Sequence, residues 1–317
     1  MRILITGATG YIGRQLTNSL VGEHEIFTAG KEHSKLLDPS IVQHVGFDML
    51  EDNDWGKVLP DIDVVVYLAG KAHIARLANA DIHNEYMRIN CEAAVEAAKS
   101  AAEHSVKRFI YISSVSVNGE QSAAPFHEDD IPKPIGAYGQ SKHAAELELR
   151  QLSKTSDLEI VVIRPPMVVG PNAKGNVGRI VTWASGRILL PLPLGHTGNK
   201  RSIVGLSNLI SFITICLSHP RAANEVFFVS DEVDLSTTQL FKSFAVAFRK
   251  KPILVPIPPF IMKLGLAMMG KSHLAKRLFG NFQIETSKAR DLLGWKPEVS
   301  LKSQCEEIYT VSASQNQ

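Results

Sequence analysis

The 317-residue sequence has only three cysteines, and Cys91, Cys216 and Cys305 lie far apart along the chain. An odd number of widely spaced cysteines gives neither a disulfide framework nor the short spacing of a metal site. We therefore expect reduced thiols, no bound metal and a cytoplasmic protein. A signal peptide is not expected, because an apolar run typical of a strand already begins at residue 2.

The sequence also lacks a strong excess of charge and a long apolar run. Its net charge is only +2, which gives no reason to expect a nucleic-acid partner. The most apolar late stretch, residues 253–269, is interrupted by Pro256, Pro258, Pro259 and Lys263, so we do not expect it to cross a bilayer. A buried or amphipathic helix is the preferred interpretation of this stretch, and contact with a membrane surface is the alternative.

Apolar runs alternate with helical patterns through the first half of the chain, which is typical of a doubly wound α/β fold with a parallel sheet. The expected strands are 3–6, 25–29, 64–69, 107–113 and 159–164, and the expected helices are 11–21, 87–104 and 137–155. In such sheets, ligands bind beyond the carboxyl ends of the strands. Residues 69–70, 113–114 and 164–165 are therefore expected to line one crevice.

Prolines and glycines become frequent after residue 165, which predicts irregular backbone. Further along, the pattern predicts a strand over 226–229 and helices over 237–249 and 286–293. We expect a Rossmann-type dinucleotide-binding domain over 1–165 and a smaller substrate-binding lobe over 166–317. The lobe is expected to interleave with the first domain rather than to fold independently.

A glycine-rich loop follows the first strand directly, at Gly7, Gly10 and Gly13. The first glycine permits a sharp turn, the second lets the backbone approach a phosphate, and the third lets the next helix pack closely on the strand. The amino end of that helix directs free N–H groups at an anion. The loop therefore predicts a nucleotide-phosphate site formed by Gly7, Thr9, Gly10, Tyr11, Ile12 and Gly13.

Tyr138 and Lys142 are four residues apart near the start of a predicted helix, so they share one helix face. A nearby ammonium group is expected to lower the pKa of a tyrosine, which makes the phenol a useful acid or base. Alone, such a pair is often an ordinary surface pair. Here Ser114, at the end of a strand in the same predicted crevice, could share a hydrogen bond with a substrate oxygen.

These features resemble the extended short-chain dehydrogenase/reductase family that acts on nucleotide sugars. The resemblance covers nearly the whole chain. The matching segments are TGATGYIG (6–13), Asp48, Leu68-Ala69-Gly70, Asn90, SSVSVNG (113–119), YGQSK (138–142), Arg164-Pro165, Gly170-Pro171, Arg201 and SKARDLLGW (287–295).

The resemblance implies a role for each matching residue. Tyr138 would be the catalytic acid/base, and Lys142 and Ser114 would be its partners. Asp48 would bind the adenine, Arg201 the diphosphate of the substrate, and Asn176 the substrate nucleotide. Further cofactor contacts would come from Met49, Leu68, Ala69, Gly70, Asn90 and Pro165, with Ser116 and Met167 on the substrate side.

The departures from the family pattern narrow the expected reaction. Val115 and Ser116 stand where 4,6-dehydratases carry an Asp-Glu pair, so dehydration is not expected. Gly30 stands where NAD-binding members have an acidic residue, and Lys31 follows it, which favours NADP over NAD. Met167 replaces an asparagine found in epimerases, and it could suit a deoxy methyl group or simply pack.

The expected activity is reduction of a nucleotide-linked 4-keto sugar by a nicotinamide cofactor. The segments PLPLG, RSIVGLSNL and VSDEVDLST resemble UDP-N-acetylquinovosamine 4-dehydrogenases of surface-polysaccharide synthesis. The first alternative is a UDP-hexose C4 epimerase with tightly bound NAD, and the second is a non-enzymatic nucleotide sensor. A UDP-sugar is the expected partner, and a homodimer through helices 87–104 and 137–155 is expected from the resemblance.

Overall fold

A computed structural model of the chain describes all residues except 31–41, 47, 52–53, 73–78, 187–190 and 315–317. Its centre is a seven-stranded parallel sheet in the order β3-β2-β1-β4-β5-β6-β9. Strands β1, β4 and β5 consist almost wholly of buried residues, because helices cover both faces of the sheet. The strand bounds are β1 Arg2–Thr6, β2 Glu25–Gly30, β3 Val42–Gly46, β4 Val64–Tyr67, β5 Arg108–Ile112, β6 Glu159–Arg164 and β9 Val226–Phe228.

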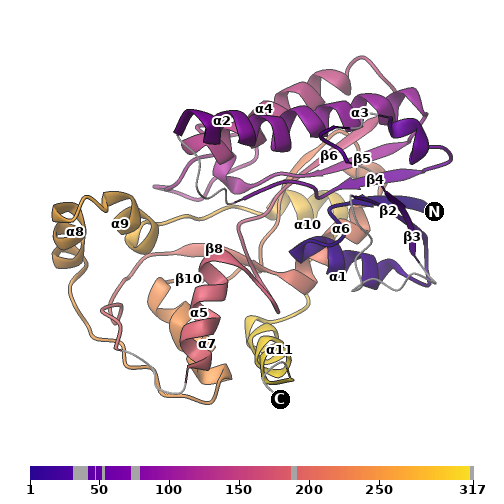
Figure 1. Cartoon of the computed structure of the whole chain (residues 1–317). Helices are drawn as coiled ribbons and strands as arrows, with labels where there is room; N and C mark the ends of the chain where they lie inside the picture. The colour runs from indigo at the N-terminus through magenta and orange to yellow at the C-terminus, as the bar shows by residue number, and fades with distance from the viewer. Residues whose placement is uncertain (31–41, 47, 52–53, 73–78, 187–190, 315–317) are drawn as a thin grey trace.

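Two layers of helices enclose this sheet (Figure 1). One face carries α2 (Asn79–Met87), α3 (Ala93–Glu103) and α4 (Gly136–Leu152), with the short helix η1 (Trp55–Lys57) beneath. The other face carries α1 (Tyr11–Leu20), α6 (Leu206–Cys216) and α10 (Ser287–Leu293). A π-helical turn, η2 (Arg88–Glu92), joins α2 to α3. The fold is the predicted Rossmann-type α/β architecture.

A smaller sheet of order β10-β8-β7 forms the base of the second lobe. Its strands are β7 (Met167–Val169), β8 (Arg201–Gly205) and β10 (Asp234–Leu235). The helices α5 (Gly175–Ser185), α7 (Thr237–Ala247) and α11 (Leu301–Ser314) pack on it around a separate hydrophobic cluster. The helices α8 (Pro259–Met268) and α9 (Ser272–Phe279) extend beyond it at the left of Figure 1. Short helical turns occur at η3 (Val115–Val117) and η4 (Pro220–Ala222).

The chain after residue 165 contributes to both sheets. Strand β9 pairs in parallel with β6 at the edge of the large sheet. Trp295, far along the sequence, lies in the same buried cluster as Ile3 of the first strand. The second half of the chain therefore completes the core around the large sheet.

One prediction about local structure is wrong. The glycine and proline content after residue 165 predicted irregular backbone, yet α5 is a regular helix. It forms because Val177, Ile180 and Ala184 are buried against the small sheet. Gly178 suits this packing, since a Cβ there would lie 2.5 Å from the carbonyl oxygen of Ala173. Burial here outweighs the weak intrinsic preference of glycine for helix.

The described residues contain no helix that is long and apolar enough to cross a membrane. Within the same described ranges, His, Cys, Asp and Glu side chains form no group of three or more suited to a metal ion. The three cysteines are buried and unpaired with one another.

Candidate active site

The glycine loop has the geometry that its sequence predicts. Gly7 has a φ of +68°, and a Cβ there would lie 2.8 Å from the backbone nitrogen of Ala69. A Cβ at Gly13 would lie 2.2 Å from the carbonyl oxygen of Gly7, so α1 can lie this close to the loop only with glycine. No side chain caps the amino end of α1, and its first turn has no acidic residue. These exposed N–H groups fit the phosphates of a dinucleotide.

The segment after β4 lies directly beside this loop. The backbone N–H of Ala69 donates to the hydroxyl of Thr6 at 3.3 Å. Gly70 comes next, and a Cβ there would lie 3.6 Å from the Nζ of Lys142. The glycine loop, the end of β4 and Lys142 therefore form one continuous surface at the carboxyl ends of the strands.

The side chain of Asn90 is hydrogen-bonded to the segment after β4. It is fully buried in the π-helical turn η2, a feature often found at functional sites. Its side chain accepts from the backbone N–H of Lys71 at 2.9 Å and donates to the carbonyl oxygen of Lys71 at 3.0 Å. It also donates to the hydroxyl of Ser141 on α4 at 3.2 Å. Asn90 was predicted to contact the cofactor. Its hydrogen bonds position the segment after β4 against α4.

Lys142 is buried at the centre of the site. Its Nζ donates to the carbonyl oxygen of Ile112 at 2.8 Å and lies 4.5 Å from the ring centre of Tyr111. Burial lowers the pKa of Lys142 from its ordinary 10.5 to about 8, and the nearby carboxylate of Glu146 opposes that decrease.

The lowered pKa of Lys142 predicts a specific dependence of stability on pH. The unfolded chain binds more protons than the folded chain between pH 8 and 10.5, so this residue's contribution to stability rises with pH across that window and is constant below it. Relative to a Lys142→Met variant, the free energy of unfolding should rise by about 3 kcal/mol over the window. Urea unfolding at a series of pH values measures this. A difference in unfolding free energy between the two proteins that does not change with pH would contradict the lowered pKa of Lys142.

Tyr138 lies half-buried on the first turns of α4 and forms a hydrogen bond with the hydroxyl of Ser114. The four-residue spacing predicted that Lys142 lowers the pKa of this tyrosine, and that prediction is wrong. Burial raises the pKa of Tyr138, the bond to Ser114 opposes the increase in part, and neighbouring Tyr86 adds to it. The phenol is therefore protonated at neutral pH, as a proton donor must be.

The close approach of α4 to the turn carrying Ser114 depends on Gly139. A Cβ on this residue would lie 2.7 Å from the carbonyl oxygen of Ser116. The side chain of Ser114 also accepts from the backbone N–H of Ser116, which shapes the turn. The absence of a side chain at Gly139 therefore sets the separation between Tyr138 and Ser114.

A Gly139→Ala variant should move Tyr138 away from Ser114. We expect kcat to fall by about 10- to 100-fold, because small displacements of reacting groups strongly reduce the reaction rate. A matched control is Gly265→Ala in α8, where a Cβ meets no atom within 4 Å. That control should keep full activity. Steady-state kinetics of both variants test the prediction, and equal activity would contradict it.

A buried hydrogen-bond network that was not predicted from the sequence holds the ends of the strands next to the site. Glu146 lies one helical turn after Lys142 and accepts hydrogen bonds from the Nε of Arg164 at 3.0 Å and from the hydroxyl of Ser113. Arg164 also donates to Asn118 at 3.2 Å. Glu146 thus joins the ends of β5 and β6, which precede Ser114 and Pro165. The signal available in the sequence was the four-residue repeat of Tyr138, Lys142 and Glu146.

The remaining predicted cofactor residues lie around this centre. An Asp48 carboxylate oxygen accepts from the backbone N–H of Leu50 at 3.2 Å, which orders the turn after β3. The Tyr11 hydroxyl would lie 2.8 Å from a Cβ on Gly170, and burial raises its pKa. Gly30 ends β2, and Lys31 lies outside the described residues. Thr9 is exposed in the loop, Ile12, Met49 and Leu68 are half-buried, and Pro165 is buried.

The predicted substrate residues lie at the margin of the site and on the second lobe. Ser114 and Ser116 share a turn, and their hydroxyls lie 3.1 Å apart. Met167 begins β7, and Arg201 begins the neighbouring strand β8. The Arg201 guanidinium lies 5.7 Å from the ring centre of Phe282. Asn176 is exposed on the first turn of α5.

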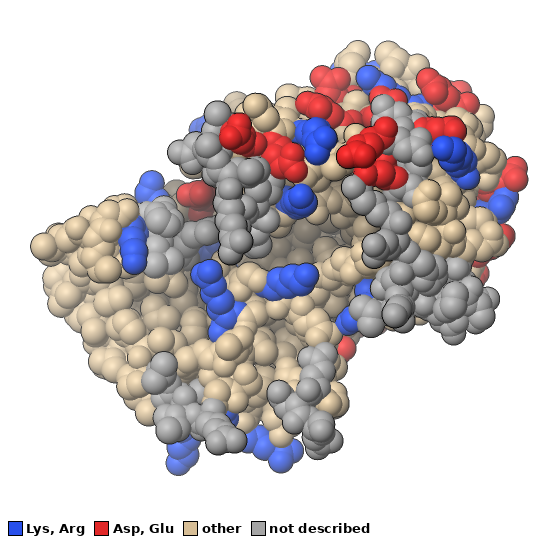
Figure 2. Space-filling view, in the orientation of Figure 1, with Lys and Arg blue, Asp and Glu red and all other residues tan. Residues whose placement is uncertain are grey.

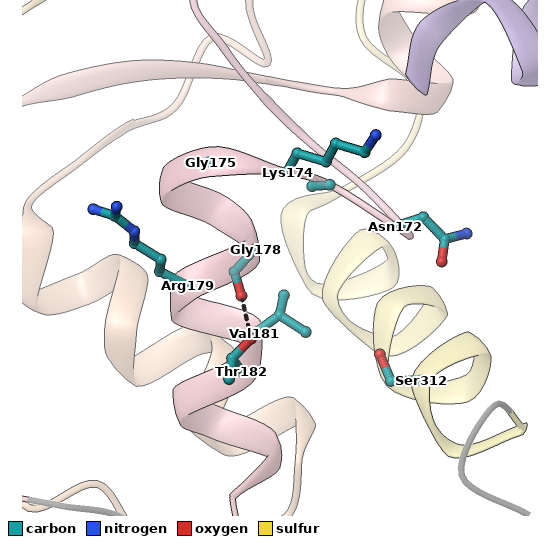
Figure 3. Close-up of a pocket in the computed structure, with 9 residues that line it drawn as sticks. Asn172, Lys174, Gly175, Gly178, Arg179, Val181, Thr182 and Ser312 are labelled. Atoms are coloured by element: carbon teal, nitrogen blue, oxygen red, sulfur yellow. Dashed lines mark hydrogen bonds between the residues drawn. The ribbon is translucent and has the colours of Figure 1, made fainter. Parts of the chain in front are cut away.

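Figure 2 shows a hollow between the half with the large sheet and the half with the small sheet, with Lys or Arg side chains within it. A separate hollow of about 620 Å³ lies between α5 and α11 (Figure 3). Lys174 and Arg179 line it, but in Figure 3 their charged ends point away from Ser312 on α11. This second hollow contains none of the candidate catalytic side chains.

The fold and the site together define a Rossmann-type protein with a tyrosine, a lysine and a serine at the carboxyl ends of its strands. The model of the NAD dependent epimerase/dehydratase family matches residues 3–229, and the chain belongs to this family. The nicotinamide dinucleotide of this chain is accordingly NAD or NADP.

Similar proteins include enzymes of more than one activity. The chain is 38% identical to a UDP-glucose 4-epimerase of Vibrio cholerae, covering 95% of this chain and 92% of that protein. It is 25% identical to a GDP-6-deoxy-D-mannose reductase of Pseudomonas aeruginosa, covering 97% of this chain and 95% of that one. The structure of a UDP-glucose 4-epimerase from Thermotoga maritima has a TM-score of 0.81 and 21% identity, covering 100% of both chains. These similarities confirm the fold, and they favour the epimerase alternative over the expected 4-keto reductase.

Proposed function

We propose that the chain is a UDP-hexose 4-epimerase that carries NAD. The observation with most weight is the 38% identity to the Vibrio cholerae enzyme over 95% of this chain. The site supports the proposal because Lys142 lies beside the Ala69-Gly70 segment that meets the glycine loop, and the same helix carries Tyr138, which hydrogen-bonds to Ser114. Val115 and Ser116 add no ionisable group that could move a proton at a second carbon.

The residues have separate tasks in this reaction. Tyr138 must first lose its own proton; its phenolate then removes the proton from the C4 hydroxyl, and the resulting phenol later returns a proton to the same oxygen. Ser114 hydrogen-bonds to Tyr138 and is placed to bond that oxygen as well. Lys142, a buried cation, favours negative charge nearby and is placed to hold the ribose of the cofactor. A nicotinamide bound beside these residues would supply reversible hydride transfer at C4, and the keto sugar would have to turn over between removal and return of the hydride for the configuration to change without net oxidation.

A second candidate is a reductase of a nucleotide-linked 4-keto sugar that uses NADPH. Gly30 favours it, because β2 ends without the carboxylate that would bind the ribose hydroxyls of NAD and repel the 2′-phosphate of NADP. The similarity to the Pseudomonas aeruginosa reductase is a weaker support at 25% identity.

One set of assays separates the two candidates. For an epimerase, purified protein should interconvert UDP-glucose and UDP-galactose without added cofactor, and denaturation should release NAD in a near one-to-one ratio. For a reductase, there should be no interconversion, and a 4-keto UDP- or dTDP-sugar should oxidise NADPH stoichiometrically. Interconversion without bound dinucleotide would contradict both.

We also propose a homodimer that buries the outer side of α4. Leu147 on this helix is 55% exposed and offers an apolar side chain to a partner on the outer side of α4. A Leu147→Asp variant should shift the molar mass measured by light scattering towards that of a monomer. An unchanged molar mass would place the interface elsewhere.

A further inference from the structure

Helix α8 is apolar on two opposite sides, and only one of them is covered. Met262 and Leu266 pack inward on a small cluster with Leu194 and Phe279. On the other side, Phe260, Leu264 and Met268 recur every four residues and therefore form one stripe along the helix. These three side chains are 70%, 62% and 83% exposed, and Ile261 and Met269 beside them are also exposed.

Such a stripe is unusual on a protein surface. Large exposed apolar patches generally mark contact sites for proteins, ligands or membranes. Figure 2 shows a broad uncharged surface at the left, where α8 and α9 lie in Figure 1. No helix in the described residues crosses a membrane, and α8 has only ten residues, so any lipid contact would be interfacial.

The sequence on either side of α8 contains basic residues but no acidic ones. Residues 235–284 contain no Asp or Glu, whereas they contain eight Lys and Arg: Lys242, Arg249, Lys250, Lys251, Lys263, Lys271, Lys276 and Arg277. The whole chain has 34 Lys and Arg against 32 Asp and Glu, so the rest of it is net negative. Lys263, Lys271 and Lys276 are exposed on or next to the two helices. The small net charge of the chain is therefore the sum of a basic stretch of sequence, residues 235–284, which includes the apolar stripe, and a net negative remainder.

We propose that the exposed stripe of α8, with the basic residues around it, docks on the surface of an anionic lipid bilayer. An interfacial helix buries its apolar side in the boundary between headgroups and acyl chains, while nearby cations attract anionic headgroups. The α8 stripe and its neighbouring lysines provide both parts. An apolar protein partner alone would not explain fifty consecutive residues without a carboxylate. The docking surface lies on α8, a different helix from α4, which carries Tyr138 (Figure 1).

Sedimentation of the full-length protein with lipid vesicles tests the proposal. One vesicle type is pure phosphatidylcholine, and the other contains one quarter phosphatidylglycerol. We expect binding to the anionic vesicles only, and release when salt is added, because salt screens the attraction. A variant with Phe260→Asp and Leu264→Asp should bind roughly tenfold more weakly or worse. A Lys263→Glu, Lys271→Glu variant should lose affinity for the anionic vesicles as well.

The control places the same substitution on another exposed apolar residue. Ile131 is 79% exposed in the segment before α4, and an Ile131→Asp variant should bind vesicles as the parent does. Circular dichroism and thermal unfolding establish that each variant is folded. No binding to anionic vesicles, equal binding to neutral ones, or unchanged binding of the double variant would overturn the proposal. A molar mass that falls in the Phe260→Asp, Leu264→Asp variant would also overturn it, because a second copy of the chain would then cover α8.

Discussion

Replacing Tyr138 by phenylalanine is expected to reduce kcat by about 10²- to 10⁴-fold, the range typical of a lost general acid/base. The phenol is the group that forms the hydrogen bond with Ser114, and burial raises its pKa so that it holds its proton at neutral pH. The variant keeps the aromatic ring and therefore the packing against Tyr86, whose ring centre lies 5.9 Å away. Binding of the dinucleotide, measured by fluorescence, should change little.

Tyr86→Phe is the matched control for this variant. It removes a hydroxyl from the neighbouring ring, and that hydroxyl donates to the carbonyl oxygen of Ala72 at 3.2 Å. We expect a loss of about 1 kcal/mol in stability, typical of one hydrogen bond, and near-normal turnover. If Tyr138→Phe retained turnover as Tyr86→Phe does, the assignment of the acid/base would be wrong.

The second large effect is expected from Glu146→Gln. Glu146 and Arg164 are both buried, and their side chains meet at 2.5 Å. Loss of the carboxylate leaves the guanidinium charge uncompensated, which should cost about 3–5 kcal/mol of folding free energy. Because Glu146 favours the charged form of Lys142, the variant should also lower the pKa of Lys142 further below about 8.

Two measurements separate these consequences of Glu146→Gln. Urea unfolding reports the stability, and the pH dependence of kcat/KM reports the ionisation of Lys142 in the free enzyme. Glu148→Gln, on the same helix but exposed, is the control and should change neither. A Glu146→Gln protein that is destabilised but has an unchanged pH profile would limit Glu146 to a structural role.

The sequence was sufficient to predict the elements that carry the chemistry. The glycine loop, five of the six strands up to residue 164 and the helix with Tyr138 and Lys142 are local patterns, so their bounds agree with the structure within a few residues, whereas β3 (Val42–Gly46) was not predicted. The helix predicted from residue 87 begins earlier, at Asn79, and contains the π-helical turn at Asn90. That turn depends on hydrogen bonds to Lys71 and Ser141, which are distant in sequence and give no local signal.

Features that arise from distant contacts were missed for the same reason. The pKa of Tyr138 depends on burial by the folded chain, which the spacing of Tyr138 and Lys142 does not show. The role of Glu146 depends on Arg164, which lies on a different element. The solvent-exposed stripe of α8 also needed the structure, because apolar residues in a sequence are usually assumed to be buried.

The addition of β9 to the edge of the large sheet has a consequence for synthesis of the chain. Until residue 228 leaves the ribosome, β6 presents unpaired N–H and C=O groups along its outer edge. Trp295 must follow before the cluster around Ile3 is filled. The earliest segment made is thus among the last to reach its final packing, and the outer edge of β6 stays open while residues 165–228 are made.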